Sequence, residues 1–124
     1  MPFPVDEKYL VACEAHIGRS LPTELRARLS KNNGGEIEVD GEPWRLFPVW
    51  DDSERDRIKR TANHIVTETT AAHAGWGMSG DLVTIGEDGC GNYLVLKPYG
   101  EEVFVWGHET QELSVAKISW TVLS

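Results

Sequence analysis

The chain is 124 residues long, the size of one compact domain that can bury a core of its own. It carries 20 Asp and Glu residues against 12 Lys and Arg residues, a formal net charge of -8. A charge of this sign disfavours nucleic acid and anionic membranes as partners and favours basic proteins. The sequence is 40% hydrophobic and contains five Trp, which excludes disorder as its main state. We therefore expect residues 1–124 to form a single domain.

The negative charge is concentrated in the second half of the chain. Residues 1–62 contain 12 acidic and 10 basic residues, a net charge of -2. Residues 63–124 contain 8 acidic and 2 basic residues, a net charge of -6. Acidic surfaces also keep proteins soluble, so no single carboxylate indicates a function. Taken together, the second half predicts a negative face that suits a cationic partner.

Cysteine content and the N-terminus predict a cytoplasmic protein. Cys13 and Cys90 are the only two cysteines, too far apart for a disulfide framework. The first residues have neither a basic start nor an apolar stretch, so they do not resemble a signal peptide. No apolar run approaches the about 20 residues that a membrane helix needs.

Helical periodicity dominates the first half. Apolar residues three and four apart predict a helix over residues 5–17 that Gly18 ends. A second, short helix is predicted to begin near Leu21-Pro22-Thr23 and to stop at Asn32-Asn33-Gly34-Gly35. Its inward residues are expected to be Leu25 and Leu29, and its outward residues Arg26 and Arg28.

A β-hairpin and a long helix are predicted next. Residues 36–39 alternate like a strand, Asp40-Gly41 signals a tight turn, and residues 44–49 form the returning strand. A proline in that segment predicts a short or an edge strand. Ser53 then predicts the N-cap of one helix that ends before Gly75. Its inward face is expected to carry Ile58, Ala62, Ile65, Val66 and Thr69.

Strand alternation dominates the second half. Three segments have the composition of strands: residues 82–85, 93–96 and 102–106. The glycine-rich residues 74–80 predict a loop, and residues 86–92 predict a tight connection. Residues 115–123 suit either a strand or a helix. Helices first and an antiparallel meander later predict an α+β domain.

No catalytic or metal-binding constellation is complete in the sequence. Cys13 and His16 lack the further ligands and spacing of a zinc site. Cys90 between two glycines is the one candidate nucleophile, and folding could bring His108 close as its base. A tight hairpin explains Cys90 without chemistry. We therefore expect no enzyme activity, no catalytic residue, no metal and no cofactor.

The glycine spacing in residues 86–92 also invites two ligand-binding interpretations. A phosphate loop would need a lysine and a following helix, and this segment leads into a predicted strand instead. A calcium loop would need alternating oxygen ligands and a closing glutamate, which are absent. A turn with positive φ angles accounts for the glycines.

Three short motifs follow one another in a fixed order: Asn33-Gly34-Gly35 after the two helices, Ile85-Gly86-x-Asp88-Gly89-x-Gly91-Asn92-Tyr93-Leu94, and His108-Glu109 followed by Val115-Ala116-x-Ile118-Ser119. In their order and spacing they resemble the SUKH superfamily, over nearly the whole chain. The resemblance implies an α+β fold with a mixed, mostly antiparallel sheet flanked by helices. It also implies that the Asn, Asp and Gly motif residues form turns and have no catalytic role. The family's C-terminal helix is usually longer than the segment after His108.

The resemblance also implies a function. Bacterial members of the superfamily are largely immunity proteins that bind and neutralise a toxin, often a nuclease, and fungal members regulate cell-wall synthesis as interaction modules. We expect a non-enzymatic immunity protein that occludes a cognate toxin stoichiometrically. Because nucleases bind phosphate with basic surfaces, the toxin is expected to be basic. A general interaction or scaffold module is the alternative, and a small-ligand-binding protein or thiol enzyme is less favoured. The oligomeric state stays open.

The predicted partner-binding residues are acidic side chains near turns of the second half and two tryptophans in predicted loops. Tryptophan is a frequent interface anchor, and most of the five are expected in the core. Asp88 has an alternative role, because its carboxylate can hydrogen-bond its own turn. The acidic candidates are Asp81, Glu87, Asp88, Glu101, Glu102 and Glu109, and the aromatic candidates are Trp50 and Trp76.

Overall fold

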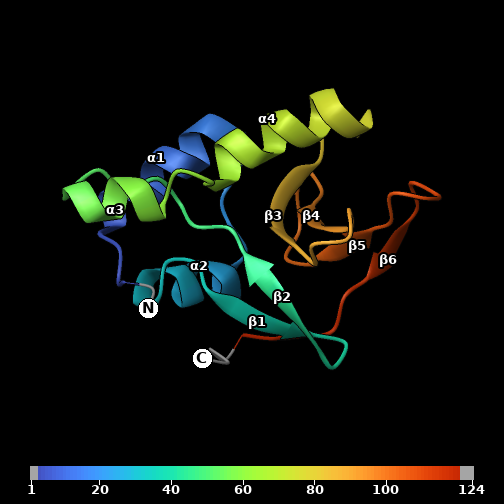
Figure 1. Cartoon of the computed structure of the whole chain (residues 1–124), viewed down its shortest axis with the longest axis horizontal. Helices are drawn as coiled ribbons and strands as arrows, with labels where there is room; N and C mark the ends of the chain where they lie inside the picture. Colours follow the sequence, from blue (N-terminus) through green and yellow to red (C-terminus); the bar gives the residue numbers. More distant parts are fainter. Residues whose placement is uncertain (1–2, 121–124) are drawn as a thin grey trace.

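A computed structural model describes residues 3–120 of the chain. Within these residues there are four helices and seven strands. The helices α1 and α4 lie side by side, and α4 packs against the sheet (Figure 1). The helices are α1 Glu7–Ile17, α2 Thr23–Lys31, α3 Arg55–Arg60 and α4 Ile65–Trp76. The strands are β1 Glu36–Val39, β2 Glu42–Leu46, β3 Val83–Glu87, β4 Tyr93–Leu96, β5 Phe104–Trp106, β6 Leu113–Val115 and β7 Ile118–Ser119.

The seven strands form one sheet in the order β6-β5-β4-β3-β2-β1-β7. Each neighbouring pair is antiparallel. The last described strand, β7, lies beside the first, β1, and Ile118 pairs with Val39. The predicted α+β fold, with helices flanking a mostly antiparallel sheet, is confirmed. The sheet was expected to be mixed, and all of its described strand pairs are antiparallel.

The first two helices match their predictions closely. α1 ends at Gly18, and the side chain of Asp6 caps its first turn by accepting a hydrogen bond from the Lys8 backbone N–H at 3.1 Å. Leu25 and Leu29 of α2 are fully buried, as expected.

Arg28 is an exception to the predicted outward face of α2. Only 6% of it is exposed, and its guanidinium donates to the backbone carbonyls of Asn32 and Glu36. Burial lowers the pKa of Arg28 below its ordinary value. The prediction was wrong because the long arginine stem packs inside while its head reaches carbonyl groups at the end of the helix.

The predicted hairpin is present, but its second strand is not at an edge. β2 lies between β1 and β3, with Arg45 opposite Glu87 and Leu46 opposite Gly86. The strand is short and ends before Pro48, so the missing N–H of that proline removes no hydrogen bond from the ladder.

The single long helix predicted after Ser53 is two helices. α3 begins after Glu54, and residues 61–64 interrupt the helix before α4. The Thr61 hydroxyl donates to the Arg57 carbonyl at 2.8 Å and accepts from the Asp51 N–H at 3.0 Å, which ties the end of α3 to the preceding loop. The N–H of Ile65 then donates to the Pro48 carbonyl at 2.9 Å.

Two further details of that prediction were wrong. Ser53 does not cap α3, because its hydroxyl donates to Asp51. Ile58 is 40% exposed and Ala62 is exposed, since α3 turns away from the core, whereas Ile65 and Thr69 are buried. α4 continues through Gly75 and ends at Trp76, so the loop that was predicted from residue 74 begins three residues later, at Gly77.

The second half forms the predicted strands, with β3 reaching two residues further, to Glu87. Residues 115–123, which suited either a strand or a helix, contain the last residue of β6 and the whole of β7. Residues 121–124 lie outside the described residues. Gly86 has a steric reason to be glycine. A Cβ at this position would lie 2.6 Å from the backbone oxygen of Arg45 on β2, closer than real Cβ contacts allow.

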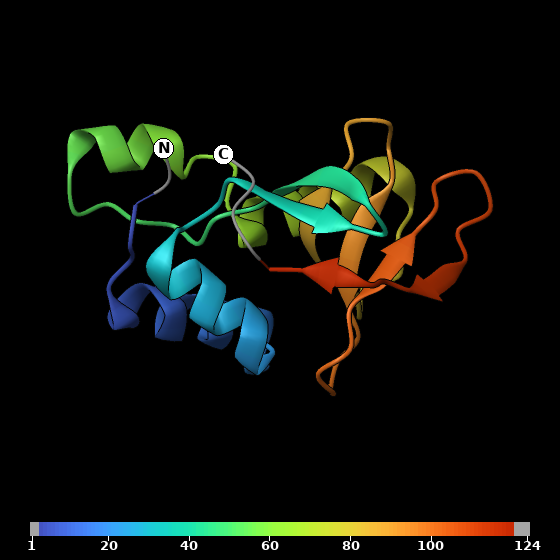
Figure 2. The ribbon, with the colours of Figure 1, turned by 90° about the horizontal axis from the view of Figure 1, so that it is seen from below.

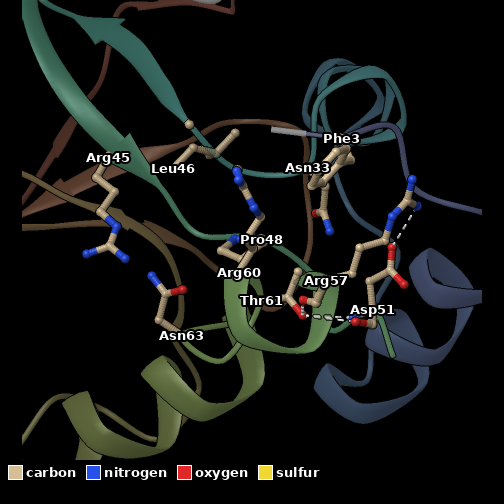
Figure 3. Close-up of a pocket in the computed structure, with 12 residues that line it drawn as sticks. Phe3, Asn33, Arg45, Leu46, Pro48, Asp51, Arg57, Arg60, Thr61 and Asn63 are labelled. Carbon is tan, nitrogen blue, oxygen red and sulfur yellow. Dashed lines mark hydrogen bonds and ion pairs between the residues drawn. The ribbon is translucent and has the colours of Figure 1, made fainter. Parts of the chain in front are cut away.

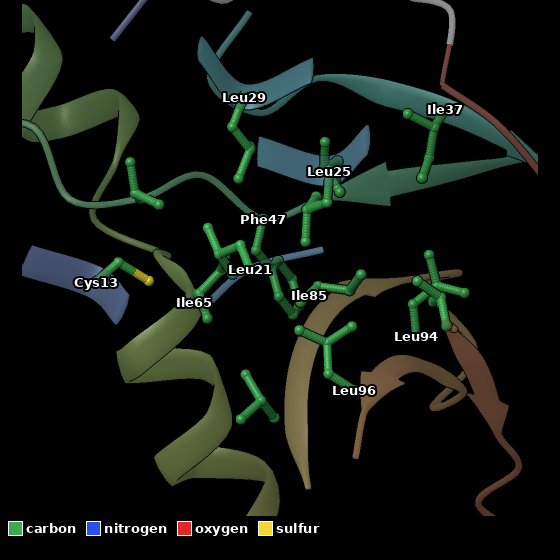
Figure 4. Packing of buried hydrophobic residues seen from close by; sticks show 14 of the residues in the cluster. Cys13, Leu21, Leu25, Leu29, Ile37, Phe47, Ile65, Ile85, Leu94 and Leu96 are labelled. Atoms are coloured by element: carbon green, nitrogen blue, oxygen red, sulfur yellow. The ribbon is translucent and has the colours of Figure 1, made fainter. Parts of the chain in front are cut away.

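The main core lies between the helices and the sheet (Figure 4). Phe47, directly after β2, is fully buried among leucine and isoleucine side chains of α2, β1 and β3. Cys13 of α1 also belongs to this core, and burial raises the pKa of its thiol to about 12. A second, smaller cluster includes Met78, Leu82 and Trp106 at the far end of α4.

Candidate partner-binding site

The structure separates the six acidic candidates into two groups. β3 and β4 form an antiparallel hairpin, so residues at its turn lie far from residues at its open end. The turn end carries Glu87, Asp88 and, after β5, Glu109. The open end carries Asp81, Glu101 and Glu102.

The carboxylate of Asp88 is used inside the turn between β3 and β4. Its Oδ1 accepts from the backbone N–H groups of Cys90 at 2.7 Å and Asn92 at 3.2 Å, and its Oδ2 accepts from the Asn92 side-chain amide at 2.8 Å. The Asn92 Oδ1 in turn accepts from the backbone N–H of His108 at 3.2 Å. Asp88 therefore has the turn-forming role that was its predicted alternative.

Trp76 lies on the surface beside this turn, with 41% of its area exposed as predicted. Its ring is 5.4 Å from that of His108 and 6.5 Å from that of Trp106, between centroids. The Nδ1 of His108 lies 3.0 Å from Asn92 Oδ1, so this imidazole is held by an amide and an indole. Cys90 is exposed at the tip of the turn.

The open end of the hairpin borders a groove of about 400 Å³. Its acidic walls come from two distant parts of the chain, the first turn of α2 and the loop before β5. All three acidic side chains are exposed, and they are Glu24, Glu101 and Glu102. The apolar lining consists of Pro22, Val103, Val115, Ala116, Ile118 and Trp120.

Hydrogen bonds hold the two acidic walls together. Glu101 Oε1 accepts from the backbone N–H of Thr23 at 2.8 Å, which caps the start of α2. This bond and the charge of Arg19 hold the pKa of Glu101 below its ordinary value. Arg19 itself donates to the carbonyls of Lys97 and Gly100, each at 2.6 Å. The groove is thus anchored at Glu101, and Glu24 and Glu102 are the carboxylates that extend from its rim.

Asp81 lies at the same end of the sheet but lines another hollow, beside Arg19 and Pro98. Trp50 is further away, in the connection between β2 and α3, and is 39% exposed as predicted. Its ring lies 5.4 Å from that of His64 over a hollow of about 270 Å³ between α1 and α4. The candidates therefore do not form one continuous face.

A profile of the SMI1 / KNR4 family (SUKH-1) matches residues 4–121. The chain belongs to this family. No curated protein and no solved structure matched the chain at the significance required.

The Asn33-Gly34-Gly35 motif has a clear structural role. The buried Asn33 amide donates to the Val49 carbonyl at 2.9 Å, and its Oδ1 accepts from the Val49 N–H at 2.8 Å. Gly34 and Gly35 follow with φ angles of 107° and 85°, which only glycine adopts readily. The motif therefore joins the end of α2 to the segment after β2.

Sequence analysis missed two features of this SUKH-1 protein. Glu24 was not a candidate, because nothing local relates the first turn of α2 to the loop that carries Glu101. The apolar lining of the groove was also missed, because the sequence pattern of its residues is that of an ordinary hydrophobic core. Within residues 3–120, no helix is long and apolar enough to cross a bilayer, and no three His, Cys, Asp or Glu side chains gather as a metal site.

Proposed function

We propose that this SUKH-1 protein is a non-enzymatic immunity protein that binds a cognate basic toxin, of nuclease type, in the cytoplasm. It acts as a single domain and neutralises the toxin by covering its substrate-binding surface in a one-to-one complex. Membership of the SUKH-1 family supports a role in protein binding. The observation that carries the proposal is the groove between the first turn of α2 and the loop before β5, whose lining combines three acidic side chains with apolar ones.

This groove suits a lysine or arginine side chain of the partner. Such a side chain has an apolar stem and a charged head, and it buries the stem while keeping the head near opposite charge. Ala116 and Ile118, both half-buried, offer apolar surface for the stem, and Glu24 and Glu102 offer carboxylates for the head. A neighbouring apolar residue of the partner would find Val115, which is 59% exposed.

The charge of the whole chain supports the same partner. The net charge of -8 attracts a basic protein at long range and speeds its encounter with the groove. Nucleases bind phosphate through basic surfaces, so an acidic protein that covers such a surface also blocks the substrate. Inhibition then requires binding alone, with no turnover.

Affinity purification from the host at low salt, with mass spectrometry of the captured proteins, tests the proposal. We expect one basic polypeptide in a one-to-one amount, and an association rate that falls steeply with salt. Capture of no such polypeptide, or salt-independent association, would contradict the proposal.

Charge reversal at the groove locates the site. We expect Glu24→Lys with Glu102→Lys to slow association about tenfold at low salt. Asp56→Lys and Glu54→Lys together make the same charge change on and beside α3, away from the groove, and serve as the matched control. If the two double variants slow association equally, the groove is not the binding site, and the net charge of the chain accounts for the effect.

The general interaction module is the second candidate, and strand β6 favours it. β6 is an edge strand of the sheet, and all three of its residues are exposed. Exposed edge strands can add a strand from a partner. Purification of an extended, non-toxic partner whose binding is lost in Ser114→Pro, while Glu102→Lys has no effect, would favour this function.

A further inference from the structure

The connection from β4 to β5 presents an aromatic side chain to solvent. Tyr99 is 82% exposed, more than any other large hydrophobic side chain of residues 3–120. Figure 2 shows this connection as a narrow orange loop that projects beyond the end of the sheet, away from the turn between β3 and β4. Tyrosine is a frequent interface anchor, because its ring covers a large area and only two side-chain torsions have to be fixed. Tyr99 is therefore an aromatic anchor outside the lining of the acidic groove.

Arg19 holds the backbone on both sides of Tyr99. It follows directly after Gly18, which ends α1, and its guanidinium donates to the carbonyls of Lys97 and Gly100, each at 2.6 Å. Gly100 has a φ angle of 95°, which favours glycine. The loop that carries Tyr99 is thus fixed before a partner arrives, and little of it has to be ordered on binding.

Carboxylates lie near the start and the end of this loop. At its start, Pro98 lines the same hollow as Asp81. At its end, Glu102 lines the acidic groove together with Glu24. All three carboxylate side chains are exposed. Tyr99 therefore stands on the loop between carboxylates of two hollows.

The basic residues of the loop and of its anchor are engaged within the protein. A backbone hydrogen bond and the charge of Arg19 hold the pKa of Glu101 below its ordinary value, so Arg19 and Glu101 offset each other. The Nζ of Lys97 lies 4.5 Å from the ring centroid of Phe104 on β5, where the face of the ring attracts the ammonium. The surplus charge around the loop is therefore negative.

Positive charge gathers at the other side of the molecule. α3 carries four of the 12 basic residues of the chain, and Figures 1 and 2 both place it opposite β5 and β6. Beside it, Arg57 and Arg45 line a pocket between α3 and the end of β2, and Arg57 is paired there with Asp51 (Figure 3). A positively charged partner is therefore attracted to the side that carries the Tyr99 loop and not to α3.

We infer that Tyr99 receives an arginine side chain of a basic partner, stacked on its ring. A flat guanidinium stacks on an aromatic ring and keeps its N–H edge for hydrogen bonds, whereas the ammonium of lysine is a compact point charge. Exposed carboxylates near the loop, among them Glu102 and Asp81, are acceptors for that edge. The inference rests on the proposed function for the identity of the partner, but the contact with arginine can be measured without the toxin.

NMR titration of the full chain with hexa-arginine and with hexa-lysine measures this contact. The two peptides have the same charge, so general attraction to an acidic protein is common to both. We expect hexa-arginine to bind about threefold more tightly and to shift the amide signals of residues 97–102 most. Equal binding of the two peptides would overturn the inference.

Variants of Tyr99 assign the preference for arginine to its ring. The preference is expected to disappear in Tyr99→Ala and to persist in Tyr99→Phe, which keeps the ring. Ile58→Ala is the matched control, because it shortens an exposed apolar side chain on α3, and we expect it to keep the preference. A preference for arginine that persists in Tyr99→Ala would contradict the inference.

Arg19→Gln tests whether the fixed loop matters. Without the bridge between the two carbonyls, we expect the preference for hexa-arginine to fall about twofold in the chain with Tyr99 and to change no further in Tyr99→Ala. Thermal unfolding checks that the variant is folded. An unchanged preference in folded Arg19→Gln would exclude Arg19 as a positioning residue.

Dissociation of the captured basic polypeptide separates this inference from the proposed function. Tyr99→Ala changes no charge, so we expect an unchanged association rate and dissociation about tenfold faster. If charge reversal at Glu24 and Glu102 slows association but Tyr99→Ala leaves dissociation unchanged, the proposed function stands and the inference fails. If no polypeptide is captured but the preference for hexa-arginine depends on Tyr99, the proposed function fails and the contact with arginine stands.

Discussion

Replacement of Asn33 by alanine tests how the Asn33-Gly34-Gly35 motif stabilises the fold. Asn33 is 8% exposed, and its amide makes both hydrogen bonds to the backbone of Val49. Asn33→Ala leaves the Val49 N–H and C=O without these partners in a buried place. A buried backbone group without a partner costs about 1–3 kcal/mol, so we expect a loss of about 3 kcal/mol in the free energy of unfolding.

Denaturant unfolding and calorimetry measure this loss. For a chain of this length, about 3 kcal/mol corresponds to a fall of about 12 °C in Tm. Asn32→Ala is the matched control, because the neighbouring Asn32 is half-buried and its contact with Arg28 uses its backbone carbonyl, which alanine keeps. We expect the control to stay within about 0.5 kcal/mol of the unmodified chain.

Asn33→Asp separates hydrogen bonding from side-chain volume. The carboxylate can still accept from the Val49 N–H, but its second oxygen replaces the amide that donates to the Val49 carbonyl. We expect a loss at neutral pH that is at least as large as in Asn33→Ala. If Asn33→Asp is as stable as the unmodified chain, or Asn33→Ala loses less than about 1 kcal/mol, the reasoning is refuted.

Three further predictions follow from steric fit, thiol burial and titration. Gly86→Ala places a methyl group 2.6 Å from a β2 carbonyl oxygen, so we expect a loss of about 2–3 kcal/mol in denaturant unfolding, whereas Gly80→Ala meets nothing within 4 Å and changes little. A thiol reagent added to the native protein is expected to label the exposed Cys90 and not the buried Cys13, and labelling of both at equal rates would contradict the fold. Burial and the charge of nearby His16 lower the pKa of His64 in the folded state. As the pH drops, the unfolded chain therefore takes up a proton at this residue before the folded chain does, and we expect the free energy of unfolding to fall as the pH drops through about 6.5. His64→Gln should flatten that part of a Tm-against-pH curve, and an unchanged curve would exclude His64 as the cause.

Much of the fold could be predicted from local patterns. α1 and its end at Gly18, the β1–β2 hairpin and the strands β3 and β4 all follow from periodicity and turn residues, which act within a few positions of the chain. The break between α3 and α4 could not. It depends on Thr61 and Ile65 making hydrogen bonds to the segment after β2, and no local signal reports those bonds.

The candidate sites divide in the same way. The sequence by itself determined that the chain is acidic, that its second half carries most of the excess negative charge, and that Trp50 and Trp76 are exposed. Only the tertiary structure decided which charged side chains lie close to one another. It separated the acidic candidates between two ends of a hairpin and brought Glu24 beside Glu101. It also gathered arginines of β2 and α3 around one pocket. The physical reason is that net charge is a sum over residues, whereas a binding site depends on distances between residues that only long-range packing sets.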